Sequence, residues 1–225
     1  MDVLSLEDFL ADIPKLHFWE DVWNAGGFGS RPLRRMHDLA IEYGQGSARI
    51  LETGTGASTI AFLLPGATEV ISIAPDADLF ARLERFCTDK DVPMAALRKH
   101  VERSETCLPR LAALKGARRL SVDLALMDGG HGWPTVFVDF CYMHAMLRQG
   151  GLLLVDDVQL HSVKEFVRFL QAQADYSYLF TLDGPKTRVF KKLTDRRFMD
   201  GHGGQPYVLA RTKADADRGQ AYGLD

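Results

Sequence analysis

The sequence is poor in cysteine, in long apolar runs and in basic clusters, and each shortage excludes a class of protein. Its three cysteines, Cys87, Cys107 and Cys141, lie far apart and form no Cys-x-x-Cys pair, so we expect reduced thiols rather than disulfides. No apolar run reaches the roughly 18–20 residues that cross a membrane. The first eight residues include three acidic and no basic residues, unlike a secretory signal. We therefore expect a cytoplasmic protein with no membrane partner.

The charge balance argues against nucleic acid as a partner. The 225 residues include 27 Lys and Arg against 30 Asp and Glu, for a net charge of −3. Proteins that bind a nucleic-acid backbone gather basic residues on one face, and this chain has no basic block. We expect a small-molecule partner instead. The length suits one generous α/β domain or two small ones.

Strand-like and helix-like stretches alternate from about Arg49 to Val167, which is typical of a parallel sheet with helices on its faces. Two β-prone runs follow, 176–182 and 187–192, and flank a turn at Asp183-Gly184-Pro185. This ending predicts a late antiparallel pair. The strands that we expect before it are 49–53, 69–74, 96–101, 122–127 and 152–155, and the helices are 59–64, 78–90, 105–114, 134–147 and 162–172.

The pattern divides the chain into three parts. Residues 1–48 are expected to be mainly helical and to form a lid, a dimer contact or a packing element at the sheet edge. Residues 49–193 form the core, and residues 194–225 are a polar, glycine-rich tail for which we expect partial disorder. Several aromatic residues could line an apolar acceptor pocket, although aromatic side chains more often fill the core. These are Trp19, Trp23, Phe28 and Trp133.

The most informative segment is ILETGTGAST, residues 50–59. An apolar strand ends in Glu52, and a turn containing Gly54 and Gly56 leads into a helix. Such a turn lets backbone N–H groups approach a ligand closely. A carboxylate at the strand end would repel a pyrophosphate but suits an ammonium group or a ribose hydroxyl, so the segment favours S-adenosylmethionine. A nicotinamide cofactor is disfavoured because Thr59 interrupts the Gly-x-Gly-x-x-Gly pattern.

Acidic residues end two further expected strands. Asp128 follows the fourth strand, and Asp156 and Asp157 follow the fifth. In an open α/β sheet, ligands bind beyond the carboxyl ends of the strands. Carboxylates gathered there need a cation, hydrogen bonds or a raised pKa, and Mg²⁺ prefers such oxygen ligands. The alternative is that Asp156 and Asp157 cap the next helix or lie in solvated turns.

Three segments carry a resemblance to a known family: residues 50–59, 122–131 and 150–158. They resemble class I S-adenosylmethionine-dependent methyltransferases, in the branch of the catechol and sugar O-methyltransferase-like enzymes. The resemblance extends over about 49–192. It implies an α/β, Rossmann-like doubly wound sheet of seven strands, mostly parallel with a C-terminal antiparallel hairpin and helices on both faces. It further implies methyl transfer from S-adenosylmethionine to a hydroxyl of a small molecule, with Mg²⁺ as an optional cofactor and a homodimer as an open alternative.

The resemblance also assigns roles to residues. Glu52, Gly54 and Gly56 match the motif that holds the amino-acid end of the cofactor, and Ser58 could donate a hydrogen bond to the cofactor carboxylate or cap the helix. Asp128 is expected both near the cofactor and in catalysis.

Asp128, Asp156 and Asp157 match the Mg²⁺ ligands of metal-dependent members, in which the metal lowers the pKa of the substrate hydroxyl. His131 lies where such enzymes place a base and could accept the hydroxyl proton. A loop histidine bonded to the backbone is its alternative.

Two departures from the family pattern keep a second reading open. Ala74 stands where an acidic residue usually binds the ribose hydroxyls, and Asp76 could reach them from two residues further on. Arg103 stands where an acidic residue is common near the adenine, and Ser104 could serve instead. These changes also fit a non-catalytic cofactor-binding or interaction module on a methyltransferase fold. A metal-dependent relative with other chemistry stays open as well, because the aspartates alone do not name a reaction.

Overall fold

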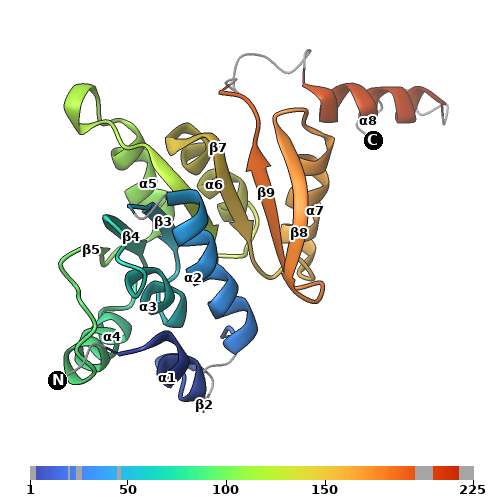
Figure 1. The fold of residues 1–225 in the computed structure, drawn as a ribbon. Helices are drawn as coiled ribbons and strands as arrows, with labels where there is room; N and C mark the ends of the chain where they lie inside the picture. The colour runs from blue at the N-terminus through green and yellow to red at the C-terminus, as the bar shows by residue number, and fades with distance from the viewer. Residues whose placement is uncertain (1–3, 20, 24–26, 45–46, 196–204, 218–225) are drawn as a thin grey trace.

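The computed structural model describes residues 4–19, 21–23, 27–44, 47–195 and 205–217. Its centre is a seven-stranded sheet in the order β5-β4-β3-β6-β7-β9-β8 (Figure 1). All neighbouring pairs from β5 to β7 are parallel, and β9 is antiparallel to both of its neighbours. The strands are β3 (Arg49–Thr53), β4 (Glu69–Ile73), β5 (Leu97–His100), β6 (Val122–Met127), β7 (Leu147–Val155), β8 (Tyr176–Asp183) and β9 (Thr187–Lys192).

Helices cover both faces of this sheet (Figure 1). One apolar core includes residues of α1 (Leu6–Ala11), α2 (Ser30–Gly44), α3 (Ala57–Leu63) and α4 (Ala77–Asp89), and a second includes residues of α5 (Ser104–Ala112), α6 (Thr135–Met146) and α7 (His161–Ala172). Strand β6 divides its side chains between the two. Leu124 and Leu126 lie in the first core, whereas Ala125 and Met127 lie in the second. A nearly all-apolar strand is what burial on both faces requires, and the predicted doubly wound fold is confirmed.

Three segments differ from the expectation. Residues 1–48 were predicted to be mainly helical, yet β1 (Phe18–Trp19) and β2 (Val22–Trp23) form a short antiparallel pair between α1 and α2. Strand pairs of two residues are too short to produce a periodic pattern. β7 begins at Leu147, five residues before the predicted start, with an irregular register against β6. The tail contains a helix that the sequence did not indicate, α8 (Pro206–Asp217). Partial disorder of the tail stays a prediction, because residues 196–204 and 218–225 lie outside the described residues. A 3₁₀ turn, η1, spans Gly116–Arg118.

The N-terminal segment is attached to the helical layer by specific contacts. Phe9 of α1 is fully buried in the first core, and Glu7 pairs with Arg34 of α2 at 2.6 Å. Further along, Arg82 of α4 donates a hydrogen bond from Nε to the Leu16 carbonyl oxygen at 2.6 Å. These contacts fix the path of residues 13–18 beside the carboxyl ends of β3 and β4.

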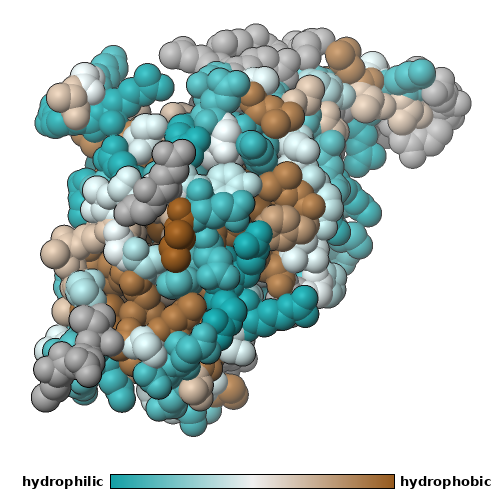
Figure 2. All heavy atoms as spheres, viewed as in Figure 1, coloured by the Kyte–Doolittle hydropathy of each residue, from teal (hydrophilic) through white to brown (hydrophobic). Residues whose placement is uncertain are grey.

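On the side of the molecule drawn in Figure 2, hydrophilic areas alternate with separate hydrophobic patches. Among the described helices, none is long and apolar enough to span a membrane.

Candidate active site

The acidic ends of three strands converge at one edge of the sheet, as the sequence predicted. β3, β6 and β7 are adjacent, with Thr53 in register with Met127 and Met127 with Val155. The strand ends are joined through the backbone, because Asp128 N–H donates to the Thr53 carbonyl at 3.1 Å and Asp156 N–H donates to the Met127 carbonyl at 3.0 Å. The residues that follow β3, β6 and β7 are therefore held side by side at the carboxyl edge of the sheet.

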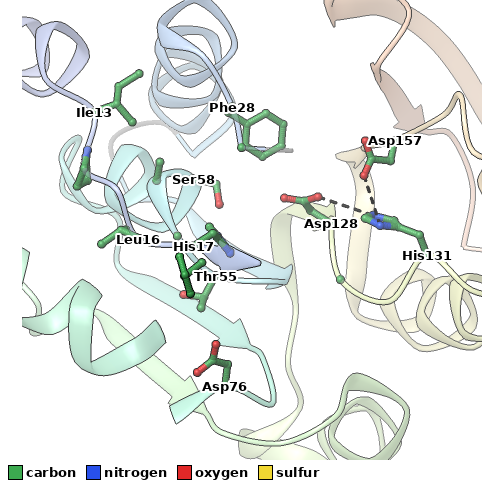
Figure 3. Close-up of a pocket in the computed structure, with 16 residues that line it drawn as sticks. Ile13, Leu16, His17, Phe28, Thr55, Ser58, Asp76, Asp128, His131 and Asp157 are labelled. Carbon is green, nitrogen blue, oxygen red and sulfur yellow. Dashed lines mark ion pairs between the residues drawn. The ribbon is translucent and has the colours of Figure 1, made fainter. Parts of the chain in front are cut away.

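A cavity of about 590 Å³ opens at this edge, within the usual range for small-molecule sites. Figure 3 shows Thr55, Ser58 and Asp76 in one part of it and His131 with Asp157 in another, with Asp128 between them. Its walls come from the N-terminal segment, the glycine turn, the start of α4 and the acidic strand ends. The lining residues are Ile13, Pro14, Leu16, His17, Phe18, Gly27, Phe28, Thr55, Gly56, Ala57, Ser58, Asp76, Asp128, Gly129, His131 and Asp157.

The two glycines of the turn have different neighbours. A Cβ added to Gly56, whose φ is +154°, would lie 2.6 Å from Nε2 of His17, so the missing side chain lets the N-terminal segment lie against the turn. A Cβ on Gly54, whose φ is +88°, would lie 2.4 Å from the Asp128 carbonyl oxygen. Gly54 therefore permits the close approach of β3 to β6, and it does not line the cavity. His17 is a cavity residue that the sequence did not indicate.

Glu52 is fully buried behind the glycine turn. The Ser58 hydroxyl donates to one of its carboxylate oxygens at 2.9 Å, and the Thr59 hydroxyl donates to the other at 2.5 Å. Burial raises the pKa of Glu52 to about 7, although hydrogen bonds from Thr59, Ser72 and Ser58 act in the opposite direction. Of these residues, Ser58 lines the cavity and Glu52 does not. Direct contact of Glu52 with a cofactor stays a prediction.

Asp76 and Ser104 were predicted to bind the ribose and adenine of the cofactor in place of the family's usual acidic residues, and the structure places them differently. Asp76 lines the cavity and caps α4, accepting a hydrogen bond from Leu79 N–H at 2.9 Å on Oδ1. Its Oδ2 lies 3.7 Å from Arg82, and half of the side chain is exposed. Ser104, at the start of α5, is buried and does not line the cavity. It helps to lower the pKa of the buried Asp139 carboxyl of α6, which burial nevertheless raises to about 6.

His131 lies between two carboxylates (Figure 3). Its Nε2 is 3.7 Å from Oδ1 of Asp128, and its Nδ1 is 3.4 Å from Oδ2 of Asp157. Burial lowers the pKa of the imidazole, although Asp157 and Asp156 raise it. The Ser162 hydroxyl at the start of α7 donates to the His131 carbonyl and so fixes this loop. The lowered pKa favours the neutral ring, and Nε2 is a buried atom that has no hydrogen-bond partner among the described residues.

Asp128, Asp156 and Asp157 form an acidic rim at the strand ends. A lysine that the sequence did not indicate lies beside this rim. Lys186, in the turn between β8 and β9, places Nζ 3.1 Å from Oδ2 of Asp156 and 3.6 Å from Oδ1 of Asp157. The other oxygen of the buried Asp156 accepts a hydrogen bond from the Thr187 hydroxyl. Burial and the Asp156 carboxylate raise the pKa of Asp128 well above its usual value. The carboxylates thus have a protein cation beside them.

The three predicted metal ligands meet at this edge, but they do not all belong to one compact group of ligand atoms. Of the described residues, one acidic group with ligand atoms within 4.8 Å of one another consists of Asp128, His131 and Asp157. Asp156 is not in this group, although its side chain interacts with that of Asp128. Its oxygens also contact Thr187 and Lys186. Mg²⁺ prefers about six oxygen ligands at about 2.0–2.1 Å, and a set containing a nitrogen and a neighbouring ammonium fits it poorly. A second group, His100, Glu102 and Cys107, lies at the end of β5.

Comparisons with known proteins agree with this architecture. Residues 51–158 match a protein-family model described as a methyltransferase domain. An O-methyltransferase from Bacillus cereus in complex with SAH is 15% identical, with a TM-score of 0.56, and the match covers 71% of this chain and 80% of that one. A methyltransferase from Geobacter sulfurreducens is 17% identical, with a TM-score of 0.55 over 72% and 80% of the two chains.

An rRNA methylase from Streptococcus thermophilus is equally similar, at 17% identity and a TM-score of 0.54, over 73% of this chain and 98% of that one. No curated protein sequence matched the chain. At these identities the solved structures establish the fold and not the acceptor. The resemblance predicted from the sequence is confirmed: residues 51–158 match a methyltransferase-domain model, and the fold is that of the class I methyltransferases among the solved structures.

Proposed function

We propose that the chain transfers a methyl group from S-adenosylmethionine to a hydroxyl of a small molecule. The observation that carries the proposal is that one cavity contains both the glycine turn and His131. The turn suits a cofactor, and the imidazole suits a proton acceptor. The two required parts of an O-methyltransferase thus share one space, with Asp128 between them.

Residues of the cavity wall would hold the cofactor. The Ser58 hydroxyl and the backbone at Gly56 suit its amino-acid end, with Glu52 and Gly54 supporting that turn from behind and Asp128 beside it. The Asp76 carboxylate suits the ribose hydroxyls, because it lines the cavity and is half exposed, and among the described residues its Oδ2 forms an ion pair only with Arg82, at 3.7 Å. A role of Ser104 near the adenine, through its hydroxyl or backbone, stays a prediction, because Ser104 is buried outside the cavity. When bound, S-adenosylmethionine supplies a methyl group attached to a positively charged sulfur.

His131 would accept the proton of the acceptor hydroxyl. Methyl transfer forms one O–C bond and breaks one C–S bond, and the hydroxyl proton must go to a base. A neutral imidazole whose Nδ1 faces Asp157 and whose buried Nε2 has no hydrogen-bond partner among the described residues could take that proton at Nε2 from an acceptor bound against it. Asp128, 3.7 Å from Nε2, then stabilises the imidazolium. Holding the acceptor oxygen in line with the methyl group supplies much of the remaining rate.

The optional Mg²⁺ at Asp128, Asp156 and Asp157 stays a prediction that the neighbouring side chains argue against. If bound, the ion would lower the pKa of the acceptor hydroxyl. Lys186 and Thr187 already contact Asp156, so no step of this proposal depends on a metal.

The N-terminal segment is proposed to act as a lid. Residues of 1–48, among them His17, Phe18 and Phe28, line the cavity directly, whereas the core 49–193 supplies the remaining wall. The described part of the tail 194–225 contributes no lining residue. A homodimer and a cytoplasmic location stay predictions.

The experiment is a two-stage assay on the full chain. Calorimetry with S-adenosylhomocysteine comes first, and release of that product is then followed with phenols, sugars, macrocyclic alcohols, amines and purified rRNA as acceptors. We expect binding and turnover with a hydroxyl acceptor. His131→Gln should lower turnover by about 10²-fold with cofactor affinity unchanged, and the exposed His161→Gln serves as the control.

Two results would contradict this proposal. Cofactor binding with turnover only on rRNA would show that the methyl acceptor is RNA and not a small molecule. Absence of cofactor binding would favour the non-catalytic module to which Ala74 and Arg103 point.

A further inference from the structure

Lys186 is fixed in place by its backbone and not by its side chain alone. The residue lies in the turn that joins β8 to β9, and its carbonyl oxygen accepts a hydrogen bond from Val158 N–H at 3.0 Å. Val158 directly follows Asp156 and Asp157. The hydrogen bond therefore ties the turn to the end of β7, and any side chain at position 186 starts from beside the acidic residues.

The ammonium group has contacts on two sides. Nζ lies 3.1 Å from Asp156 and 3.6 Å from Asp157 on one side. On the other side it lies 5.1 Å from the ring centre of Phe28, within the range of a cation–π interaction. Only about a quarter of the side chain is exposed. A long, flexible lysine held this way has a defined position between the strand end and the N-terminal segment.

The charges near this point are unbalanced without Lys186. Asp128, Asp156 and Asp157 come from two adjacent strand ends, and buried carboxylates at such spacing repel one another. Asp156 is 1% exposed, so water cannot relieve the repulsion. Among the described residues, Lys186 is the permanent cation within ion-pair distance of Asp156 and Asp157, because the lowered pKa of His131 favours its neutral ring.

A divalent ion would need the same carboxylate oxygens. To bind between Asp156 and Asp157 it would have to displace the ammonium from Oδ2 of Asp156 and Oδ1 of Asp157, and two cations at such separations repel strongly in a partly buried site. Even the group that remains, Asp128, His131 and Asp157, shares Asp157 with Lys186. Lysine and ion are therefore alternatives at this rim.

We propose that Lys186 is the resident cation of the acidic rim and occupies the role that a divalent metal would otherwise fill. Its charge balances Asp156 and Asp157 and keeps Asp157 in position to face Nδ1 of His131. Lys186 is thus a positioning residue, and the rim is complete without a metal. The catalytic part of this inference rests on the proposed function, but the exclusion of metal from the rim does not.

The first test measures metal binding to the unliganded full chain. Mn²⁺ is titrated into the metal-free protein at pH 7.5, and the free ion is followed by electron paramagnetic resonance. We expect no binding below millimolar concentration for the unaltered protein. Lys186→Gln should bind Mn²⁺ at least tenfold more tightly, and Lys186→Arg should not, because it keeps the charge.

Two controls assign any binding to this rim. Lys164→Gln removes an exposed lysine of α7 and should leave Mn²⁺ binding as weak as in the unaltered protein. Adding Asp157→Asn to Lys186→Gln should abolish the gained binding. Tight Mn²⁺ binding by the unaltered protein, lost in Asp157→Asn alone, would overturn the proposal, and so would equal weak binding with and without Lys186. The measurement on the unaltered protein decides the matter even where Lys186→Gln folds poorly.

A second readout connects the rim to turnover. The unaltered protein should keep its full rate in a chelator, whereas Lys186→Gln should lose activity in the chelator and regain at least part of it with Mn²⁺. A rate that disappears in a chelator in the unaltered protein would overturn the proposal. Failure to find any methyl acceptor would count against the proposed function and leave the Mn²⁺ titrations unaffected, so the two failures are distinguishable.

Discussion

The Nδ1 atom of His131 lies 3.4 Å from Oδ2 of Asp157, although the two residues follow different strands of the sheet. Asp157 reaches this position with a left-handed backbone, at a φ of 55°. Asn and Asp tolerate that conformation better than other non-glycine residues. The strand end is thus shaped so that one carboxylate faces both the imidazole and the ammonium of Lys186.

Asp157→Asn should lower kcat by about 10²-fold if His131 is the base, while the affinity for S-adenosylhomocysteine stays within about twofold. Asn keeps the backbone and the size but removes the charge that faces Nδ1. Because the Asp157 carboxylate raises the pKa of His131, the acidic limb of the kcat/KM profile should also move to lower pH. Steady-state rates between pH 5 and 9 measure both effects. The exposed Asp89→Asn of α4 is the matched control, and an unmoved acidic limb in Asp157→Asn would contradict the pairing.

Much of the fold could be predicted because its strands carry strong local signals. β3 and β6 have the predicted bounds, since each is a short apolar run ended by an acidic residue and a glycine. The meeting of Asp128 with Asp156 and Asp157 follows from topology alone, because parallel neighbours end at the same edge. The hairpin of β8 and β9 was visible in its Asp-Gly-Pro turn.

The site residues that the sequence did not indicate, Lys186 and His17, reach their places in the site through long-range packing that no local sequence pattern predicts. Lys186 reads in sequence as an ordinary residue of a hairpin turn, and only the pairing of β9 with β7 brings it to the acidic rim. His17 comes from a segment without regular structure, and its place against Gly56 follows from the attachment of α1 and Leu16 to the helical layer. Glu52 was predicted at the end of a strand, but its burial and its contacts with Ser58 and Thr59 arise only when the chain turns back.

Glu52 should make the protein less stable as pH rises. Its pKa is raised from 4.5 to about 7 in the folded protein, so the folded state retains a proton that the unfolded state releases. The stabilisation is complete below about pH 4.5 and is lost as pH rises through about 7. A change of that size corresponds to about 3 kcal/mol.

Urea denaturation of the unaltered protein and of Glu52→Gln between pH 5 and 8.5 measures this loss. Gln cannot ionise, so the difference in unfolding free energy between the two proteins should move in favour of Gln up to about pH 7 and then level off. Glu69→Gln, at the partly buried start of β4, is a control that should give a flat difference over this range, because Arg98 and Arg49 hold the pKa of Glu69 below its usual value of 4.5 despite burial, and its titration lies below the range. A pH-independent difference for Glu52→Gln would show that the carboxylate is ionised throughout.

Arg82 should hold the N-terminal segment over the cavity. Its Nε donates to the Leu16 carbonyl at 2.6 Å, and a hydrogen bond from a charged group contributes about 1.5–3 kcal/mol. Arg82→Ala should increase hydrogen exchange and protease cleavage in residues 13–18 and weaken S-adenosylhomocysteine binding several-fold, with α5 to α7 unaffected. Arg85→Ala, one turn along α4, is the control. Unchanged exchange in residues 13–18 would mean that α1 alone anchors the segment.

Gly56→Ala should weaken S-adenosylhomocysteine binding by at least tenfold. The new Cβ would lie 2.6 Å from Nε2 of His17, so either the ring or the turn must move, and both line the cavity. Calorimetry of Gly56→Ala with His17→Ala separates the two causes: removing the ring should restore part of the affinity if the clash dominates, and none if the strain of Ala at a φ of +154° dominates. Gly116→Ala, with no atom within 4 Å of its Cβ and a positive φ of 60°, tests backbone strain far from the cavity. Full affinity in Gly56→Ala would mean that the cofactor is held elsewhere than at the glycine turn.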